Sequence, residues 1–342
     1  CLVGSEMCIR DRRGIAVDVP VWNSANCIQC NICSYVCPHA VIRPVAMTEE
    51  EAAKAPEGMQ MKDMNGMPGY KFSITVSALD CTGCGSCVNV CPGMKGEKAI
   101  TMANCEENVG EQKYFDYGVT LDPKPEVVAK FKEATVKGSQ FNQPLLEFSG
   151  SCAGCAETSY ARLITQLFGE HMYISNATGC SSIWGGPAAT SPYTVNKDSN
   201  KGPAWANSLF EDNAEHGLGM QIGQEVLRDQ AIASAEKCAS SDKASAELKD
   251  AFAKFMETKQ DTKANTPATE VLVAELEKAA AAGCPDAKAA LEKKDYLAKK
   301  SVWIFGGDGW AYDIGFGGLD HVLASGHNVN AVSYTHLTLP TK

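Results

Sequence analysis

Two runs of four cysteines share the spacing C-x2-C-x2-C-x3-C-P and could bind iron. In that pattern, three thiolates on one tight loop hold three corners of a cubic iron–sulfur cluster, and the fourth reaches a second cluster. We therefore predict that the three leading cysteines of each run share a [4Fe-4S] cluster with the last cysteine of the other run. The predicted sets are Cys27, Cys30, Cys33 with Cys91, and Cys81, Cys84, Cys87 with Cys37. Two zinc ribbons are the alternative, but they need pairs of cysteines rather than runs of four.

A third group of cysteines is incomplete. Cys152 and Cys155 form a C-x2-C on a glycine loop that enters a helix, and Cys180 follows later. Such a loop could be a redox dithiol, half a zinc site or half a cluster, and the spacing favours a third metal centre. Glu157 lies where the helix begins. It is either a first-turn carboxylate that the helix dipole stabilises or a partner for a cofactor, and the spacing fits both.

A glycine turn with one acidic residue follows an apolar strand near the carboxyl end of the chain. Its residues are Gly306, Gly307, Asp308, Gly309 and Trp310. Glycines let a diphosphate approach the backbone, and a following helix N-terminus favours its charge. An aspartate there would repel phosphate directly but could bind a bridging Mg²⁺. An ordinary turn between strand and helix explains the same residues.

The elements that must position these residues suggest two domains. We expect an α+β ferredoxin-like domain with two [4Fe-4S] clusters over residues 13–120, because strand-like runs flank both cysteine motifs. The strand signals are at 15–19, 41–42, 72–76 and 99–102. A linker over 121–148 contains one amphipathic helix at 126–136.

Residues 149–331 have an α/β pattern, for which we expect a mostly parallel sheet. A helix at 157–168 precedes short apolar strands at 172–174, 302–305 and 329–332. Helices fill 219–299, interrupted near Pro267, and we expect Cys238 and Cys284 within them to be ordinary small core residues. Residues 1–12 and 332–342 resemble translated adaptor sequence, so we expect non-native tails without ligands.

The composition argues against several classes of protein. No apolar run reaches about 18 residues, so we expect no membrane-spanning segment. The net charge of −10 argues against nucleic acid or an anionic membrane as partner. Most of the 16 cysteines have metal-ligand spacing, which is typical of a reducing compartment, and no clean signal peptide is present. We therefore expect a cytoplasmic protein.

Taken together, these residues closely resemble the pyruvate:ferredoxin (flavodoxin) oxidoreductases over nearly all of residues 13–331. The likeness includes both cysteine runs and four further segments, at 13–20, 150–158, 202–215 and 306–315. In that family, an enzyme containing thiamin diphosphate oxidatively decarboxylates pyruvate with coenzyme A. The products are acetyl-CoA, CO2 and two low-potential electrons.

The resemblance implies roles that the spacing left open. Three cysteines match ligands of a third [4Fe-4S] cluster, two residues match thiamin-contacting positions, and four match the diphosphate and Mg²⁺ motif. The cluster ligands would be Cys152, Cys155 and Cys180, and the thiamin-contacting residues would be Glu157 and Cys180. The diphosphate and Mg²⁺ motif would be Gly307, Asp308, Gly309 and Trp310, with Asp308 as the Mg²⁺ ligand. The second domain would thus bind thiamin diphosphate. Electrons would leave through the clusters to a soluble ferredoxin or flavodoxin, and we expect the full-length protein to be a homodimer.

Parts of the family pattern are missing from this chain. They are the fourth ligand of the third cluster, the segment that completes the Mg²⁺ site, and the domains that activate thiamin and bind pyruvate and coenzyme A. We therefore expect an internal part of the enzyme that is not competent alone, and we assign no catalytic residue within it. Two alternatives remain: an oxidoreductase for another 2-oxo acid, and a non-enzymatic electron-transfer subunit that uses only the two cysteine runs.

Overall fold

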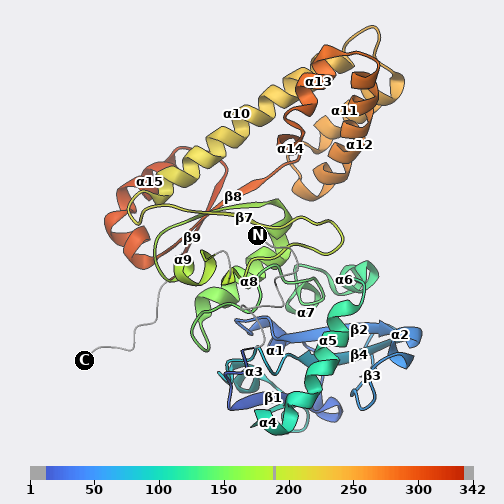
Figure 1. Cartoon of the computed structure of the whole chain (residues 1–342), viewed down its shortest axis with the longest axis vertical. Helices are drawn as coiled ribbons and strands as arrows, with labels where there is room; N and C mark the ends of the chain where they lie inside the picture. Colours follow the sequence, from blue (N-terminus) through green and yellow to red (C-terminus); the bar gives the residue numbers. More distant parts are fainter. Residues whose placement is uncertain (1–12, 188–189, 335–342) are drawn as a thin grey trace. The chain divides into compact units, whose positions relative to one another are not determined.

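The computed structural model describes residues 13–187 and 190–334, which form two compact units (Figure 1). The first unit combines residues 13–170 with 180–203, and the second combines 171–179 with 204–334. We had expected the domains to divide at residue 149. In the structure, the segment that follows this position, including the helix at 156–168, belongs to the first unit.

The first unit contains a repeated strand–helix–strand arrangement. Its elements are β1 (Asp18–Trp22), α1 (Ile32–Tyr35), β2 (Ile42–Thr48), α2 (Glu49–Ala53), β3 (Lys62–Asp63), β4 (Tyr70–Val76), α3 (Ser86–Val90), β5 (Ile100–Asn104), α4 (Cys105–Asn108), α5 (Gln112–Thr120), α6 (Pro125–Phe131), α7 (Val136–Ser139), α8 (Ala156–Phe168) and α9 (Cys180–Gly185). One copy of the repeat is β1–α1–β2, and the other is β4–α3–β5. Antiparallel pairing joins β1 to β5 and β2 to β4, and α1 contacts α3. This pairing brings both cysteine runs to the same place.

The first strand begins later than its alternating pattern predicts. We expected a strand at 15–19, but β1 starts at Asp18, opposite Asn104, the last residue of β5. Ile15 and Val17 are 58% and 75% exposed, whereas Val19 is buried in the core. The predicted strand is therefore only partly present, and burial follows the partner strand rather than the apolar pattern.

The stretch that we expected as a linker packs into the core of the first unit. It forms two short helices, α6 and α7, instead of one, because Lys132 adopts a positive φ of 62° and ends α6. Val127, Leu146 and Phe148 from this stretch are buried. Phe148 also packs edge-to-face on Phe115 of α5. The segment therefore fixes the chain that leads to Cys152 and Cys155.

The second unit is a parallel sheet with helices. Its elements are β6 (Met172–Asn176), β7 (Ala204–Asn207), α10 (Asn213–Ala239), α11 (Ala246–Thr258), α12 (Thr262–Ala281), α13 (Pro285–Leu291), α14 (Lys294–Leu297), β8 (Ser301–Gly307), a π-helical turn (Gly309–Ile314), α15 (Phe316–Ala324) and β9 (Val329–Tyr334). The strand order is β7-β6-β8-β9, and every pair is parallel, as the sequence predicted. The strand β9 continues to Tyr334, past the boundary at which we expected a non-native tail. Residues 1–12 and 335–342 lie outside the described residues.

Helices α10 to α14, which we call the helical module, enclose a separate apolar core (Figure 1). An apolar stripe runs along α11, with Leu248 and Phe255 buried and Phe252 packed beside them. Pro267 does not separate two helices as expected but lies inside α12, where its missing N–H removes one hydrogen bond near the amino end. Within the described residues, no helix is long and apolar enough to span a bilayer.

Two glycines of the second unit should respond in opposite ways to alanine. A Cβ at Gly306 would lie 2.4 Å from the Trp310 ring, whereas a Cβ at Gly317 in α15 would meet nothing within 4 Å. We expect Gly306→Ala to destabilise the unit by about 1–3 kcal/mol through overpacking. Gly317→Ala should stabilise it by about 0.5–1 kcal/mol, because alanine loses less backbone entropy in a helix. Urea midpoints at equal slopes measure both, and a stable Gly306→Ala variant would contradict the packing described.

Candidate metal centres

The first predicted ligand set converges on one cavity. Cys27, Cys30, Cys33 and Cys91 line one cavity, together with apolar residues that include Trp22. The first three come from the loop and first turn of α1, whereas Cys91 is the residue that ends α3. The structure therefore brings together the four cysteines that the crossed pattern predicts. We call this space the first cavity.

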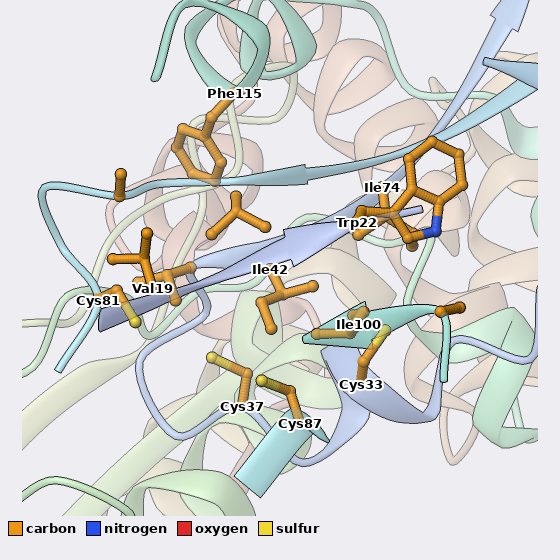
Figure 2. Packing of buried hydrophobic residues seen from close by; sticks show 14 of the residues in the cluster. Val19, Trp22, Cys33, Cys37, Ile42, Ile74, Cys81, Cys87, Ile100 and Phe115 are labelled. Carbon is orange, nitrogen blue, oxygen red and sulfur yellow. The ribbon is translucent and has the colours of Figure 1, made fainter. Parts of the chain in front are cut away.

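The second predicted set surrounds a matching space, the second cavity. Cys37, Cys81, Cys84 and Cys87 together line this cavity. Figure 2 shows the sulfur atoms of Cys37 and Cys87 turned toward a common space beneath Ile42. Each cavity thus takes three cysteines from one run and one from the other. In the part of the chain that the structure describes, no three His, Cys, Asp or Glu side chains converge on a single-ion site.

Left-handed residues curl both cysteine loops in the same way. Gly83 and Gly85 of the second run have positive φ, and Gln29 and Asn31 occupy the matching positions of the first run with φ of 61°. The curl points backbone N–H groups at sulfur atoms. The Gln29 N–H donates to Cys27 Sγ at 3.4 Å, and the Gly83 N–H donates to Cys81 Sγ at 3.4 Å. Such donors stabilise negative charge on thiolates and clusters.

Side-chain hydrogen bonds hold the two non-glycine residues in this unusual conformation. The Gln29 amide donates to the Asp63 carbonyl at 2.7 Å and accepts from the Asn65 N–H at 2.8 Å. The Asn31 amide donates to the Lys137 carbonyl at 3.0 Å. These bonds offset the steric cost of positive φ for residues that have a Cβ.

The cysteine thiols are poorly suited to ionise without a bound cation. Burial, and then neighbouring cysteines, raise the pKa of Cys33 well above its usual range. Burial also raises the pKa of Cys81 and of Cys87 to about 12 in each case. Buried thiolates that face each other repel, so a metal centre of positive charge would supply what these cavities lack. The donor sets therefore fit iron–sulfur clusters.

The third cysteine group, Cys152, Cys155 and Cys180, lies at the amino ends of α8 and α9. Burial raises the pKa of the Cys180 thiol, and the nearby charges of Glu157, Cys155 and Cys152 raise it further. Glu157 is only 5% exposed, and its carboxylate accepts a hydrogen bond from the Trp184 indole N–H at 3.2 Å. The structure thus brings the three predicted cysteines and Glu157 together.

Two hydrogen bonds anchor the loop of the third cysteine group to the first unit. His39 Nδ1 lies 3.1 Å from Ser149 Oγ, and the Arg13 guanidinium donates to the Ser149 carbonyl at 2.9 Å. Burial, and then the Arg13 charge, lower the pKa of His39 to about 4, so its imidazole is neutral at pH 7. His39 also lines the second cavity.

The same loop lies directly against the second cavity. A Cβ at Gly154 would come within 3.5 Å of the Cys84 Cβ, and Gly154 itself has a positive φ of 75°. Glycine therefore permits both the turn between Cys152 and Cys155 and its close approach to a cysteine of the other site. The loop of the third cysteine group is therefore adjacent to the second cavity, and the second cavity shares its cysteine runs with the first.

The predicted diphosphate residues lie at the carboxyl end of β8 in the second unit. Asp308 is half-buried, and its side chain accepts from the Gly309 N–H at 3.0 Å at the start of the π-helical turn. Trp310 is buried, and its ring occupies the space that a side chain at Gly306 would need. Gly306 therefore serves packing, while Gly307 and Gly309 border the turn. We had expected a regular helix here; instead Asp313 leaves the helical conformation.

Two asparagines that we did not predict lie at the same edge of the sheet. Asn176 ends β6 and Asn207 ends β7, and the Asn176 amide donates to Asn207 Oδ1 at 3.4 Å. Ligands of open α/β sheets bind at the carboxyl ends of the strands, where these residues and Asp308 are found. No local sequence pattern marks these two asparagines, because strand register alone brings them together.

Comparisons with known proteins agree with these sites. A model of the 4Fe-4S dicluster domain matches residues 26–94, which contain both cysteine runs. The chain is 50% identical to the pyruvate-flavodoxin oxidoreductase of Klebsiella pneumoniae, over 95% of this chain and 27% of that protein. It is 51% identical to the pyruvate:ferredoxin oxidoreductase of Moorella thermoacetica, over 94% of this chain and 28% of that protein.

A relative with a different electron acceptor in its name matches a similar share of this chain. The mitochondrial pyruvate dehydrogenase (NADP+) of Euglena gracilis is 42% identical over 94% of this chain and 17% of that protein. The chain therefore spans between a sixth and a third of the length of these three relatives. The predicted resemblance is confirmed: along nearly its whole length, this chain is homologous to one segment of the pyruvate-flavodoxin and pyruvate:ferredoxin oxidoreductases.

Proposed function

We propose that this chain is the electron-transfer part, and a portion of the thiamin-binding part, of an enzyme that oxidatively decarboxylates pyruvate with coenzyme A to acetyl-CoA and CO2. The observation that carries the proposal is the pair of cavities, each lined by four cysteines, with a third cysteine group against the second one. Homology to pyruvate oxidoreductases along 94–95% of the chain supports the substrate.

The contacts suggest an order for the electrons. When bound, thiamin diphosphate supplies the electron sink for decarboxylation, and iron–sulfur clusters accept single electrons. The third cysteine group would hold the cluster that receives the electrons, since Glu157 and Cys180 match thiamin-contacting positions. Gly154 then lies against Cys84 of the second cavity. The crossed cysteines Cys37 and Cys91 join the second cavity to the first.

The first cavity opens toward a surface that suits a carrier protein. Ile28, Val90 and Met94 beside it are 38–41% exposed. Lys95 and Lys98 are exposed nearby with the exposed Glu97 between them, so basic groups outnumber the acidic one in this segment although the chain is acidic overall. We propose that a ferredoxin or flavodoxin takes the electrons here, because such a mixed patch can steer and hold an acidic partner.

In the second unit, we propose that the turn after β8 binds the diphosphate of thiamin through Mg²⁺. Asp308 would bind the ion, and Gly307 and Gly309 would let the phosphates approach the backbone. One carboxylate oxygen of Asp308 already holds the turn through Gly309. We further propose that the full-length enzyme is a cytoplasmic homodimer.

The direct experiment is turnover by the full-length gene product, purified without oxygen. With thiamin diphosphate, Mg²⁺ and coenzyme A, we expect pyruvate to give acetyl-CoA and CO2 while ferredoxin or flavodoxin is reduced. Faster turnover of 2-oxobutanoate or 2-oxoglutarate would reassign the substrate. Reversible cluster reduction without turnover of any 2-oxo acid would instead indicate an electron-transfer subunit.

Iron loss should reveal which cysteines share a cluster. Because Cys27 and Cys91 line one cavity, Cys27→Ala and Cys91→Ala should each remove about four iron atoms per chain, and the double variant should remove no more. Cys27→Ala with Cys37→Ala should remove about eight, because these residues line different cavities. Iron and sulfide analysis after anaerobic reconstitution measures this. Additive loss for the first pair would contradict the crossed arrangement.

Asp308 should control metal-dependent cofactor binding. Asp308→Asn keeps the hydrogen-bonding shape of the side chain but removes the charge that attracts Mg²⁺. We expect thiamin diphosphate to bind the variant at least about tenfold more weakly in calorimetric titrations with Mg²⁺. Asp320→Asn on α15 is the matched control and should bind as the wild type does. Equal affinity for the Asp308 and Asp320 variants would exclude Asp308 as the ligand.

A further inference from the structure

Two cysteines that belong to none of the candidate metal centres meet in the helical module. Cys238 lies one residue before the end of α10, and Cys284 precedes the first residue of α13. They are 46 positions apart in the sequence, yet their sulfur atoms are 3.1 Å apart. The sequence led us to expect ordinary small core residues, and spacing alone gave no reason to pair them.

The surroundings favour a covalent link between the two sulfur atoms. A disulfide needs about 2.05 Å between sulfur atoms, so the pair must close by about 1 Å. Cys284 is in the turn between α12 and α13, directly after Gly283, which has a positive φ of 93°. The two cysteines therefore meet where the end of α10 passes the turn between α12 and α13.

We propose that Cys238 and Cys284 form a reversible disulfide when the protein meets a hydroperoxide, and that this bond locks α10 to the α12–α13 turn. The oxygen–oxygen bond of hydrogen peroxide breaks, and both S–H bonds are replaced by one S–S bond. The two thiols lose two electrons and two protons, which leave with the peroxide oxygens as two water molecules. A dithiol reductant reverses the step.

Burial sets the order of the two reactions. Cys238 is 3% exposed, whereas Cys284 is half-buried, so peroxide reaches Cys284 first and converts it to a sulfenic acid. The Cys238 thiol then attacks that sulfur, and the second water leaves. Burial, and then the hydrogen bond with Cys284, raise the pKa of Cys238 to about 12, so Cys238 is a protonated thiol at pH 7. Oxidation of Cys284 to a sulfenic acid creates the sulfur atom that Cys238 attacks.

The bond would close a loop that contains most of the helical module. Helices α11 and α12 lie entirely between the two cysteines, and their buried residues, such as Phe255 and Leu272, belong to the same apolar core. Closing this loop restricts the unfolded chain, so the oxidised module should resist unfolding more than the reduced one. The link thus protects the module under the conditions that damage iron–sulfur clusters.

Peptide mapping of the whole chain tests the proposal. The protein with its clusters is treated with hydrogen peroxide, its remaining thiols are alkylated, and it is digested without reductant. We expect a linked pair of peptides containing Cys238 and Cys284, lighter than the two thiol peptides together by two hydrogen atoms. We also expect that a single protease cut between α11 and α12 leaves the two pieces joined until dithiothreitol is added.

Matched variants separate this link from general oxidation. Cys284→Ser should abolish the linked peptides, whereas Cys105→Ser, which removes a buried cysteine of the first unit, should leave them intact. If Cys284→Ser fails to fold, the wild-type peptide map still decides the matter. Recovery of the two cysteines on separate alkylated or sulfinic peptides, or linked to cluster cysteines, would overturn the proposal.

Discussion

Each of the two cavities is completed by a thiol from the other half of the repeat, and the rest of the first unit depends on this exchange. Cys37 and Cys91 reach the opposite cavity only because antiparallel pairing places α1 beside α3. Burial and mutual repulsion disfavour the thiolates that a cluster requires. Metal binding must therefore supply free energy that the folded cavities lack, so folding and cluster assembly are thermodynamically linked.

This dependence explains why much of the first unit could be predicted. Metal-ligand spacing is a strict constraint, and the spacing by itself implied which cysteines gather around each cavity. The strand at 72–76 followed from the alternation of its apolar residues, although both of its faces are buried in the structure. The packing of residues 121–148 was not visible in the sequence, because Pro, Lys and Gly punctuation resembles a linker even when its few apolar side chains are buried.

The second unit shows a different limit. The parallel pairing of its strands followed from short apolar runs, but the turn after β8 combined two uses of glycine in one motif. Gly306 makes room for Trp310, whereas Gly307 and Gly309 border the turn that Asp308 caps. A sequence motif cannot show which glycines serve packing and which serve binding, because both roles require the same residue type. Asn176 and Asn207 come together only through strand register, which no local pattern encodes.

The left-handed residues of the two cysteine loops are supported unequally in the two copies of the repeat. The second copy has glycine at those positions, and glycine adopts positive φ without supporting hydrogen bonds. The first copy uses Gln29 and Asn31, which are held by Asp63, Asn65 and Lys137, all outside that copy. The two halves are consequently not interchangeable modules. A transplanted second copy would carry its loop geometry with it, whereas a transplanted first copy would leave its supports behind.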